Sequence, residues 1–444
     1  MVAEVYSADP KRRYEATLRM RKLLSVEQNP PIQELIDAGV VPKLVEFLSY
    51  HQEPGLQFET CWALTNIASG SSEQTRYVIE MGAVPMLKAL LSSPQNEIRE
   101  QAIWNLGNIA GDSYQCRDYL LSQGIMEPLL NCLGDSSPVT LLRNATWTLS
   151  NLCRGKPQPA WHLVAPALPT IARLVRSTDD EVLTDVCWAL SYLSDGPNER
   201  IQAILECGIA RRMIELLHHS SFSVLTPALR LVGNVVTGDD QQTQLMINNY
   251  ILPSLLALMK SSRKGIRKEA CWTISNITAG NKLQVQAVID ARVFPRLIEL
   301  VSQADFDIKK EAAWAISNAT SCGSPDQIRH LVSIGTIEPM CELLIHPDPR
   351  MVLVALEALE NILKVGELDA KQTGTNEYAT NIEECLGLDK LEQLQNHANQ
   401  DIYEKTVTIL ENYFCAEEEE NISPNVNSGQ FSFGVSTNVS AFNF

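Results

Sequence analysis

The sequence lacks the features that mark membrane-spanning, secreted and metal-binding proteins. No apolar run in its 444 residues reaches the roughly 18 residues that a membrane span needs. The N-terminal stretch MVAEVYSADPKRRYE has no apolar core of the kind found in secretory signals. The 11 cysteines are scattered and form no CxxC pair for zinc or redox chemistry. We therefore expect a protein of the cytoplasm and nucleus with small buried thiols, no metal and no cofactor.

Positive charge is also scarce. Lys and Arg number 36 against 53 Asp and Glu, which gives a formal net charge of −17 at pH 7. This balance argues against nucleic acid or an anionic membrane as the main partner, and it favours a basic ligand if the acid gathers on one surface. Catalytic signatures are missing too, since the seven His are dispersed and HExxH, GxSxG and P-loop motifs do not occur. We therefore interpret the chain as a binding protein rather than an enzyme.

One phrase recurs along the chain in five close variants. They are ETCWALTN at 59–66, QAIWNLGN at 101–108, NATWTLSN at 144–151, EACWTISN at 269–276 and EAAWAISN at 311–318. The position of the final Asn, called here the Asn column, repeats in steps of 41 to 43 residues. It comprises Asn66, Asn108, Asn151, Tyr192, Asn234, Asn276, Asn318 and Asn361. Periods of about 40–47 residues built from two or three helices mark HEAT and armadillo solenoids.

Each period predicts three helices and no strand. In the second unit the helices are 73–80, 84–92 and 96–110, because Gly closes one helix and Pro opens the next. Such a unit resembles the armadillo repeat, so the expected fold is all-α, a right-handed superhelical armadillo-repeat solenoid with a long concave groove. We place an incomplete first helix at 1–27 and a disordered, acidic and then low-complexity tail at 417–444. Between them, the array at 28–416 has units ending near 70, 112, 155, 196, 238, 280, 323, 366 and 416.

Two substitutions within the repeat predict that the Trp position, called here the Trp column, faces solvent. The simpler alternative is that a periodic Trp belongs to the core, which is the commoner role for an aromatic residue at helical spacing. Arg230 and Glu357 occupy this column in two units, while the neighbouring columns stay apolar. A buried position would not accept both charges. We therefore predict an exposed ladder of indoles.

The Trp column, the Asn column and the residue three before each Trp share one helical face. The leading residues are Glu59, Gln101, Asn144, Asp185, Glu269 and Glu311. An Asn amide can clamp the C=O and N–H of a peptide, indoles can hold Lys or Arg stems by cation–π contacts of ~0.5–2 kcal/mol each, and carboxylates select positive charge. The pattern predicts a groove for an extended basic peptide. The alternative for Asn, a helix-end cap, does not account for seven of eight at a fixed offset from Trp.

Complete Trp/Asn pairs fall into two blocks. The first block holds pairs 62/66, 104/108 and 147/151, and the second block holds 272/276 and 314/318. Arg230 stands between the blocks and should repel a cationic side chain, so we expect ligands with one basic cluster or two joined by a linker. Asp112 stands where most units have a turn Gly. Spacing alone leaves two interpretations open for it, a lysine pocket beside Asn108 or a cap for the next helix.

Several longer phrases resemble one family. ALTNIASG, REQAIWNLGNIAGDS, LRNATWTLSNLCRGKPQP and KEACWTISNITAG are similar to the importin alpha (karyopherin alpha) nuclear import adaptors, and the resemblance runs from about Asp9 to Glu420. It implies binding of mono- and bipartite Lys/Arg-rich nuclear localisation signals, with Asp112 taking a key lysine. With the leading residues added, the major site comprises Trp62, Asn66, Gly70, Thr75, Gln101, Trp104, Asn108, Asp112, Asn144, Trp147, Asn151 and Asp185. The minor site comprises Arg230, Asn234, Asp240, Glu269, Trp272, Asn276, Glu311, Trp314 and Asn318.

The resemblance also implies partners and shuttling between cytoplasm and nucleus. An export factor is expected at the C-terminal repeats. Importin beta is expected only if an Arg/Lys-rich arm exists outside this chain, because KRRYEATLRMRK at 11–22 reads as the first armadillo helix. FSFG at 431–434 resembles nuclear pore repeats, although an unstructured tail also accounts for it. The alternative function is another armadillo scaffold, such as a catenin-like adhesion or signalling adaptor, whose groove would hold acidic partners.

Overall fold

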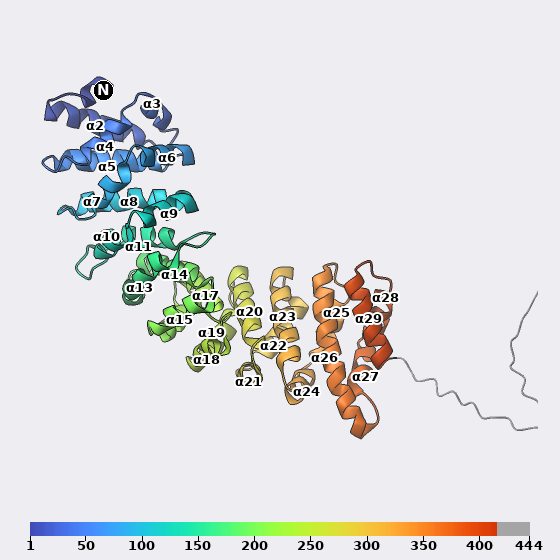
Figure 1. The fold of residues 1–444 in the computed structure, drawn as a ribbon. Helices are drawn as coiled ribbons and strands as arrows, with labels where there is room; N and C mark the ends of the chain where they lie inside the picture. Colours follow the sequence, from blue (N-terminus) through green and yellow to red (C-terminus); the bar gives the residue numbers. More distant parts are fainter. Residues whose placement is uncertain (415–444) are drawn as a thin grey trace, which may run out of the picture.

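The computed structural model describes residues 1–414, and every regular element in that range is a helix. Figure 1 shows the helices stacked one repeat after another along an elongated, curved array, with α1 (Val2–Val5) and α2 (Pro10–Leu24) at its N-terminal end. The expected tail, with its EEEE and FSFG stretches, lies in 415–444, outside the described residues.

The second repeat shows how the sequence builds a unit. Its helices are α6 (Ser72–Glu80), α7 (Ala83–Leu90) and α8 (Asn96–Asp112), which confirms the three helices predicted there. Ser71 caps α6 through a capping box with Gln74, and Gly82 turns the chain into α7 with a left-handed φ of 82°. Helix α8 runs two residues further than predicted, because Gly111 and Asp112 stay helical.

The third helix of each repeat packs against the third helix of the next, and this stack forms one face of the array, called here the third-helix face. Besides α8 it comprises α5 (Pro54–Ala68), α11 (Val139–Cys153), α14 (Asp180–Ser194), α17 (Phe222–Val235), α20 (Lys264–Thr278), α23 (Phe306–Cys322), α26 (Pro349–Thr373) and α29 (Gln400–Tyr413). Their buried Leu, Ile, Val and Ala side chains join those of the shorter helices in one continuous core.

Shorter first and second helices complete the repeats. They are α3 (Ile32–Asp37), α4 (Val41–Phe47), α9 (Tyr114–Ser122), α10 (Met126–Asn131), α12 (Trp161–Val164), η1 (Ala165–Ala167), α13 (Leu168–Leu174), α15 (Asn198–Glu206), α16 (Ala210–Glu215), η2 (Leu216–His218), α18 (Asp240–Asn248), α19 (Ile251–Leu258), α21 (Lys282–Asp290), α22 (Phe294–Gln303), α24 (Pro325–Ser333), α25 (Ile337–Leu343), α27 (Glu377–Glu384) and α28 (Gly387–Leu394).

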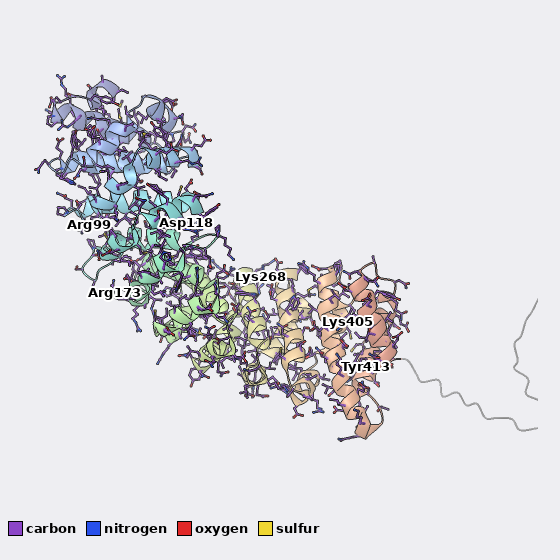
Figure 2. The ribbon with its side chains drawn as sticks, in the orientation of Figure 1. Arg99, Asp118, Arg173, Lys268, Lys405 and Tyr413 are labelled. Atoms are coloured by element: carbon purple, nitrogen blue, oxygen red, sulfur yellow. The ribbon has the colours of Figure 1, made fainter. Side chains whose placement is uncertain are left out.

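Side-chain ties hold neighbouring repeats in register. Gln284 Nε2 donates to Asp240 O at 2.8 Å, and Gln327 Nε2 donates to Lys282 O at 2.8 Å, so each first helix is fastened to the first residue of the previous one. Arg173 donates to Leu133 O at the end of the preceding second helix, where carbonyls lack partners and cations are favoured. Figure 2 places Arg173 on the outer side of the bend and Lys268 on its inner side.

One repeat departs from the pattern beside the first block. After α11 the stretch RGKPQPA (154–160) forms no helix, as its Gly and two Pro predict, and only the short α12 follows. The buried Arg117 holds this loop, donating from Nη1 to Arg154 O at 2.6 Å and from Nη2 to Pro157 O at 2.7 Å. The loop therefore has a fixed position next to the end of α11.

Candidate peptide-binding groove

The Trp column lies at the surface of the third-helix face. Trp104 is 44% exposed and Trp314 is 39% exposed, and the four others, Trp62, Trp147, Trp188 and Trp272, are half-buried. Arg230 and Glu357, the charged members of the column, are exposed. The predicted exposure is thus confirmed, although four of the six indoles are partly covered.

Two glycines explain part of that cover. A Cβ on Gly107 would lie 2.4 Å from Cζ3 of Trp147, and a Cβ on Gly233 would lie 2.4 Å from Cζ3 of Trp272. Each indole therefore packs against the backbone of the preceding third helix at a place that no larger residue could occupy without moving the ring. Sequence reasoning missed both glycines. The available signal was that Gly replaces the Ser or Thr found just before most members of the Asn column.

Most Asn residues of the Asn column tie their third helix to the helix before it. Asn108 Nδ2 donates to Thr65 O at 3.2 Å, Asn234 Nδ2 to Ser191 O at 2.9 Å and Asn318 Nδ2 to Ser275 O at 2.9 Å. These carbonyls lie in the last turn of their helices. The helix-end alternative is therefore partly correct, but each Asn caps the neighbouring helix rather than its own. Among the described residues no donor reaches the Oδ1 of these three Asn. Each amide is therefore oriented and keeps its acceptor for a ligand. Asn108 and Asn318 also keep one N–H, whereas Asn234 Nδ2 donates a second bond to Ser194 Oγ at 3.2 Å.

An open pocket of about 320 Å³ lies where α5, α8 and α11 meet. It is lined by Ala68, Ser69, Gly70, Thr75, Gly107, Asn108, Gly111, Asp112, Trp147, Asn151 and Arg154. Six predicted major-site residues thus come together from three helices and one turn. Thr75 is buried, and its hydroxyl proton goes to Ala68 O at 3.0 Å or Ser71 O at 3.2 Å. Its oxygen can therefore only accept hydrogen bonds from anything that enters the pocket.

Asp112 is the last residue of α8, and it does not cap the next helix. Ser113 fills that role, because its Oγ accepts from Cys116 N at 3.3 Å, so the capping interpretation of Asp112 is wrong. The Asp112 carboxylate accepts from Ser72 Oγ at 2.7 Å and lies 3.6 Å from Cys116 Sγ. Burial and the neighbouring Asp112 raise the pKa of the Cys116 thiol. Within residues 1–414 Asp112 has no ion-pair partner.

The setting of this carboxylate favours a cation. The C-terminal end of a helix carries a partial negative charge, so a carboxylate there is disfavoured by ~0.3–1 kcal/mol until a positive group joins it. A group with several donors and no acceptor, such as an ammonium, suits a pocket lined by the Asp112 carboxylate, Thr75 and Gly70.

The second block differs at its first Trp. Arg230 Nη2 lies 3.0 Å from Glu269 Oε2, Arg230 Nε contacts Oε1, and the guanidinium carbon lies 5.9 Å from the centre of the Trp272 ring. The expected repulsion by Arg230 therefore needs correction, because Glu269 neutralises its charge. Positive charge between the blocks comes instead from Arg263 and Lys268, which line a pocket of about 390 Å³ with Arg230 and Trp188.

Other predicted minor-site residues have local partners. Asp240 Oδ2 accepts from Asn281 Nδ2 at 2.9 Å, and Glu311 lies 3.5 Å from Lys310 Nζ. Asn276 Nδ2 is buried and has no hydrogen-bond partner in the described part of the chain. The second block is therefore poorer in free carboxylates than its sequence indicates.

The remaining leading residues of the first block line the same face. Asn144 and Gln101 are half-buried, and Gln101 Oε1 has no donor within residues 1–414. Asp185 makes no ion pair with a described residue. Burial, and to a smaller extent the nearby Glu181, together raise the pKa of Asp185 to about 7. A cationic ligand would lower this pKa by favouring the ionised form.

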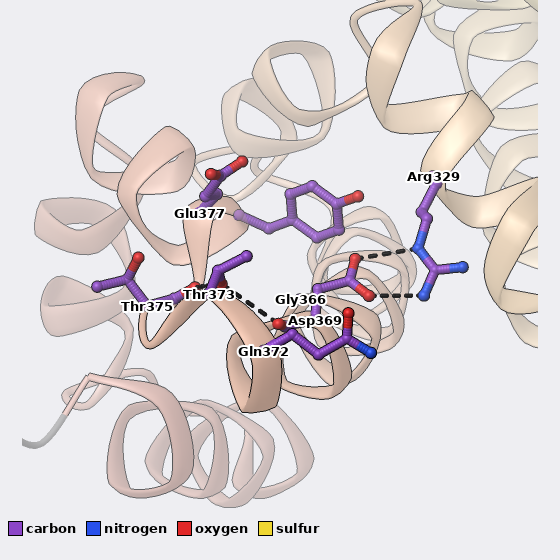
Figure 3. Close-up of a pocket in the computed structure, with 8 residues that line it drawn as sticks. Arg329, Gly366, Asp369, Gln372, Thr373, Thr375 and Glu377 are labelled. Carbon is purple, nitrogen blue, oxygen red and sulfur yellow. Dashed lines mark hydrogen bonds and ion pairs between the residues drawn. The ribbon is translucent and has the colours of Figure 1, made fainter.

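A further pocket, of about 400 Å³, lies away from the Trp and Asn columns between α24, α26 and α27. Figure 3 shows Arg329 there, donating to Asp369 from Nε at 3.0 Å and from Nη2 at 2.6 Å. Arg329 Nη1 also donates to Asp326 at 2.6 Å. Asp369, the carboxylate that lines this pocket next to Arg329, is already paired, which distinguishes it from Asp112.

Known proteins match this chain along almost its whole length. The armadillo/beta-catenin-like repeat family matches residues 28–69, 71–111, 113–154, 156–195, 197–237, 239–279 and 281–321, and an atypical Arm repeat matches 376–427. Importin subunit alpha-2 of Arabidopsis thaliana is 60% identical over 98% of this chain and 82% of its own. Importin subunit alpha-1b of Oryza sativa subsp. japonica is 56% identical over 98% of this chain and 85% of its own.

The chain belongs to the importin alpha family. Importin subunit alpha-B of Dictyostelium discoideum, another member, is 57% identical over 99% of this chain and 85% of its own. Importin alpha proteins are nuclear import adaptors rather than enzymes. An engineered protein of known structure superposes with a TM-score of 0.84 at 27% identity, covering 92% of this chain and 97% of its own. A designed armadillo repeat protein superposes with a TM-score of 0.50 at 29% identity, covering 55% and 98%.

These matches confirm the predicted all-α armadillo solenoid. Among the helices of residues 1–414, none combines the length and the apolar character that crossing a bilayer requires. The same range contains no group of three or more His, Cys, Asp or Glu side chains arranged to hold a metal ion.

Proposed function

We propose that this chain binds Lys/Arg-rich nuclear localisation signals as extended peptides along its third-helix face and carries the attached cargo proteins into the nucleus. Membership of the importin alpha family supports the adaptor role. The observation that carries the peptide site is the Asp112 carboxylate, which has no ion-pair partner within residues 1–414, at the end of α8 and in a pocket also lined by Thr75. The major site is the first block with Asp112, and the minor site is the second block.

The geometry supports a division of labour along the peptide. One lysine ammonium donates to Asp112, Thr75 and the Gly70 carbonyl, which fixes the register. The oriented amides of Asn108 and Asn151 clamp the backbone of the peptide regardless of its sequence. Neighbouring side chains lay their aliphatic stems between the indoles, where each cation–π contact is worth ~0.5–2 kcal/mol.

Further partners belong to the same proposal. We infer an export factor at the C-terminal repeats and shuttling between cytoplasm and nucleus, each from family membership. Importin beta is a partner only if an Arg/Lys-rich arm exists outside this chain. A catenin-like scaffold would need a basic groove for acidic partners. The unpaired Asp112 and the ionisable Asp185 favour a basic ligand instead.

Calorimetric titration with a Lys-rich peptide of the KKKRK type, beside an acidic peptide of equal length, tests the proposal. We expect binding of the basic peptide alone and a loss of about 100-fold in Asp112→Lys, since breaking a desolvated charge pair costs about 2–5 kcal/mol. Asp135→Lys makes the same charge change at a carboxylate that is 83% exposed, and it should bind like the unchanged chain. A preference for the acidic peptide would contradict the proposal and favour the scaffold.

A further inference from the structure

An arginine stands directly before the first block. Arg21 lies four residues before Ser25, and Ser25 accepts from Asn66 Nδ2 at 3.0 Å, so Arg21 continues the Trp column one helix upstream of Trp62. Its guanidinium pairs with Glu59 through Nε–Oε2 at 2.7 Å and Nη2–Oε1 at 3.3 Å. The guanidinium carbon lies 4.2 Å from the centre of the Trp62 ring.

The second block begins with the same arrangement. Arg230 also occupies the Trp column, pairs by two nitrogens with the carboxylate three residues before the next Trp, and lies over that Trp. Arg21–Glu59–Trp62 and Arg230–Glu269–Trp272 are therefore one motif used twice. Trp follows Trp in the column from Trp62 to Trp188 and again from Trp272 to Trp314, and Glu357 comes next.

In each motif the arginine occupies the place of a ligand side chain. A slot is defined here as the space between consecutive members of the Trp column. A cation from a peptide would enter a slot, lie on the indole and pair with the leading carboxylate. Arg21 and Arg230 already make both contacts from within the chain. Four slots remain bounded by two indoles: two within the first block, one between Trp147 and Trp188 at its end, and one in the second block, between Trp272 and Trp314.

We propose that Arg21 and Arg230 are internal occupants that close the slot before each block and so limit how many basic side chains of a ligand each block can hold. This inference rests on the proposed function. Arg21 closes its slot more firmly, because its side chain is 15% exposed and Glu59 is 8% exposed, and displacing the arginine would leave that carboxylate buried without a partner. Arg230 is 54% exposed and Glu269 is 17% exposed, so the second slot is easier to open.

The experiment measures peptide binding to the full chain after the second slot is opened. Asp112→Lys serves as the background, because it silences the first block. In that background Arg230→Trp completes the Trp column and frees Glu269, and Arg230→Ala frees Glu269 without adding an indole. The probes are synthetic peptides with four or six consecutive lysines, titrated by calorimetry, and circular dichroism checks that each variant is folded.

We expect Arg230→Trp to bind the six-lysine peptide about tenfold more tightly than the background does, the size of one added cation–π contact. The four-lysine peptide should gain less, and Arg230→Ala should gain less than Arg230→Trp. The matched control is Arg263→Ala, which removes the same charge from the same pocket but stands outside the Trp column. It should change binding by less than about twofold.

The outcomes separate the two ideas. A weaker or unchanged affinity in both Arg230 variants would make Arg230 an ordinary ligand contact and overturn the inference, as would an equal gain in Arg263→Ala. If the unchanged chain fails to bind basic peptides at all, the proposed function falls and this inference falls with it.

Discussion

The two blocks carry the same Trp/Asn pattern on the same kind of helix but differ in their free charge. In the first block, Asp112 ends α8 without an ion-pair partner in the described part of the chain and lines an open pocket. In the second block, Glu269 is neutralised by Arg230, and Arg263 and Lys268 line the neighbouring pocket. The repeated pattern therefore gives both blocks the same arrangement of Trp and Asn side chains. The residues outside the pattern decide how strongly each block attracts a cation.

The position that holds Asp112 in α8 explains much of this difference. Four residues after the Asn column the second block has Gly280 and Cys322, neither of which carries charge. Helix α20 ends at Thr278, before Gly280, whereas α23 ends at Cys322, so α8 and α23 are both 17 residues long. The second block thus has a helix end of the right geometry without the carboxylate. We infer that the first block is the stronger site.

The variant with the largest expected effect on this comparison changes the glycine against which the Trp147 indole packs. In Gly107→Ala the new Cβ would lie 2.4 Å from Cζ3 of Trp147 and 2.5 Å from Thr148 Oγ1, so the ring and its helix must shift relative to the pocket that Trp147 lines with Asp112. We expect basic peptides to bind about tenfold more weakly, the value of one lost cation–π contact and its clamp. Fluorescence titration with a labelled basic peptide measures the loss.

The control for Gly107→Ala is a glycine whose added Cβ would contact nothing. Gly265→Ala adds a Cβ that meets no atom within 4 Å, so binding should not change. Gly233→Ala moves Trp272 in the second block and should weaken binding less than Gly107→Ala does. Equal losses from Gly107→Ala and Gly233→Ala would contradict the ranking of the two blocks.

A second test transfers the carboxylate to the second block. Cys322→Asp places an acid at the end of α23, but Lys282, the first residue of α21, stands where Ser72 faces Asp112 and would neutralise it. The double variant Cys322→Asp/Lys282→Ser should therefore bind basic peptides up to about fivefold more tightly in the Asp112→Lys background, as expected for a partly exposed ion pair. The single variant Cys322→Asp is the control and should gain less. No gain in the double variant would show that the helix end alone does not make the pocket.

The sequence was sufficient for the features that repeat. The grouping of Gly70 and Thr75 with Asp112 was implied by the family resemblance alone. A period of about 42 residues, Trp four before Asn, and charged members of the Trp column together predicted the helices and the exposed indoles. These predictions succeed because each follows from local helical geometry and from comparing one repeat with the next.

Contacts between repeats were beyond that reasoning. Three features depend on how one third helix packs on the next. They are the hydrogen bonds from the Asn column to the neighbouring helix, the packing of two indoles against Gly107 and Gly233, and the ion pair that neutralises Glu269. One signal was available for the ion pairs, because in a solenoid an opposite charge about one repeat away lies on the neighbouring helix. Arg21–Glu59, Arg230–Glu269 and Arg329–Asp369 are 38, 39 and 40 residues apart.

Asp185, at the boundary between the blocks, gives the smallest predicted effect. Burial first, and Glu181 second, raise the pKa of its carboxyl to about 7, so in the free chain it is about half-protonated at neutral pH. A bound cation favours the ionised form, and binding therefore releases a proton below pH 7. Affinity for a basic peptide should rise about threefold from pH 6.5 to 7.5 and level off above pH 8, since the lysines stay protonated throughout.

Asp185→Asn separates this carboxyl from every other titrating group. The variant cannot ionise at this position, so its affinity should be nearly independent of pH in the same range and close to that of the unchanged chain at low pH. Calorimetry in buffers of different ionisation enthalpy would show the proton release directly. If the affinity of Asp185→Asn still rises with pH, the titration belongs to another group, and Asp185 does not contribute to the charge that attracts the peptide. The first block would then attract cations through Asp112 alone, and the contrast between the blocks would rest on that one carboxylate.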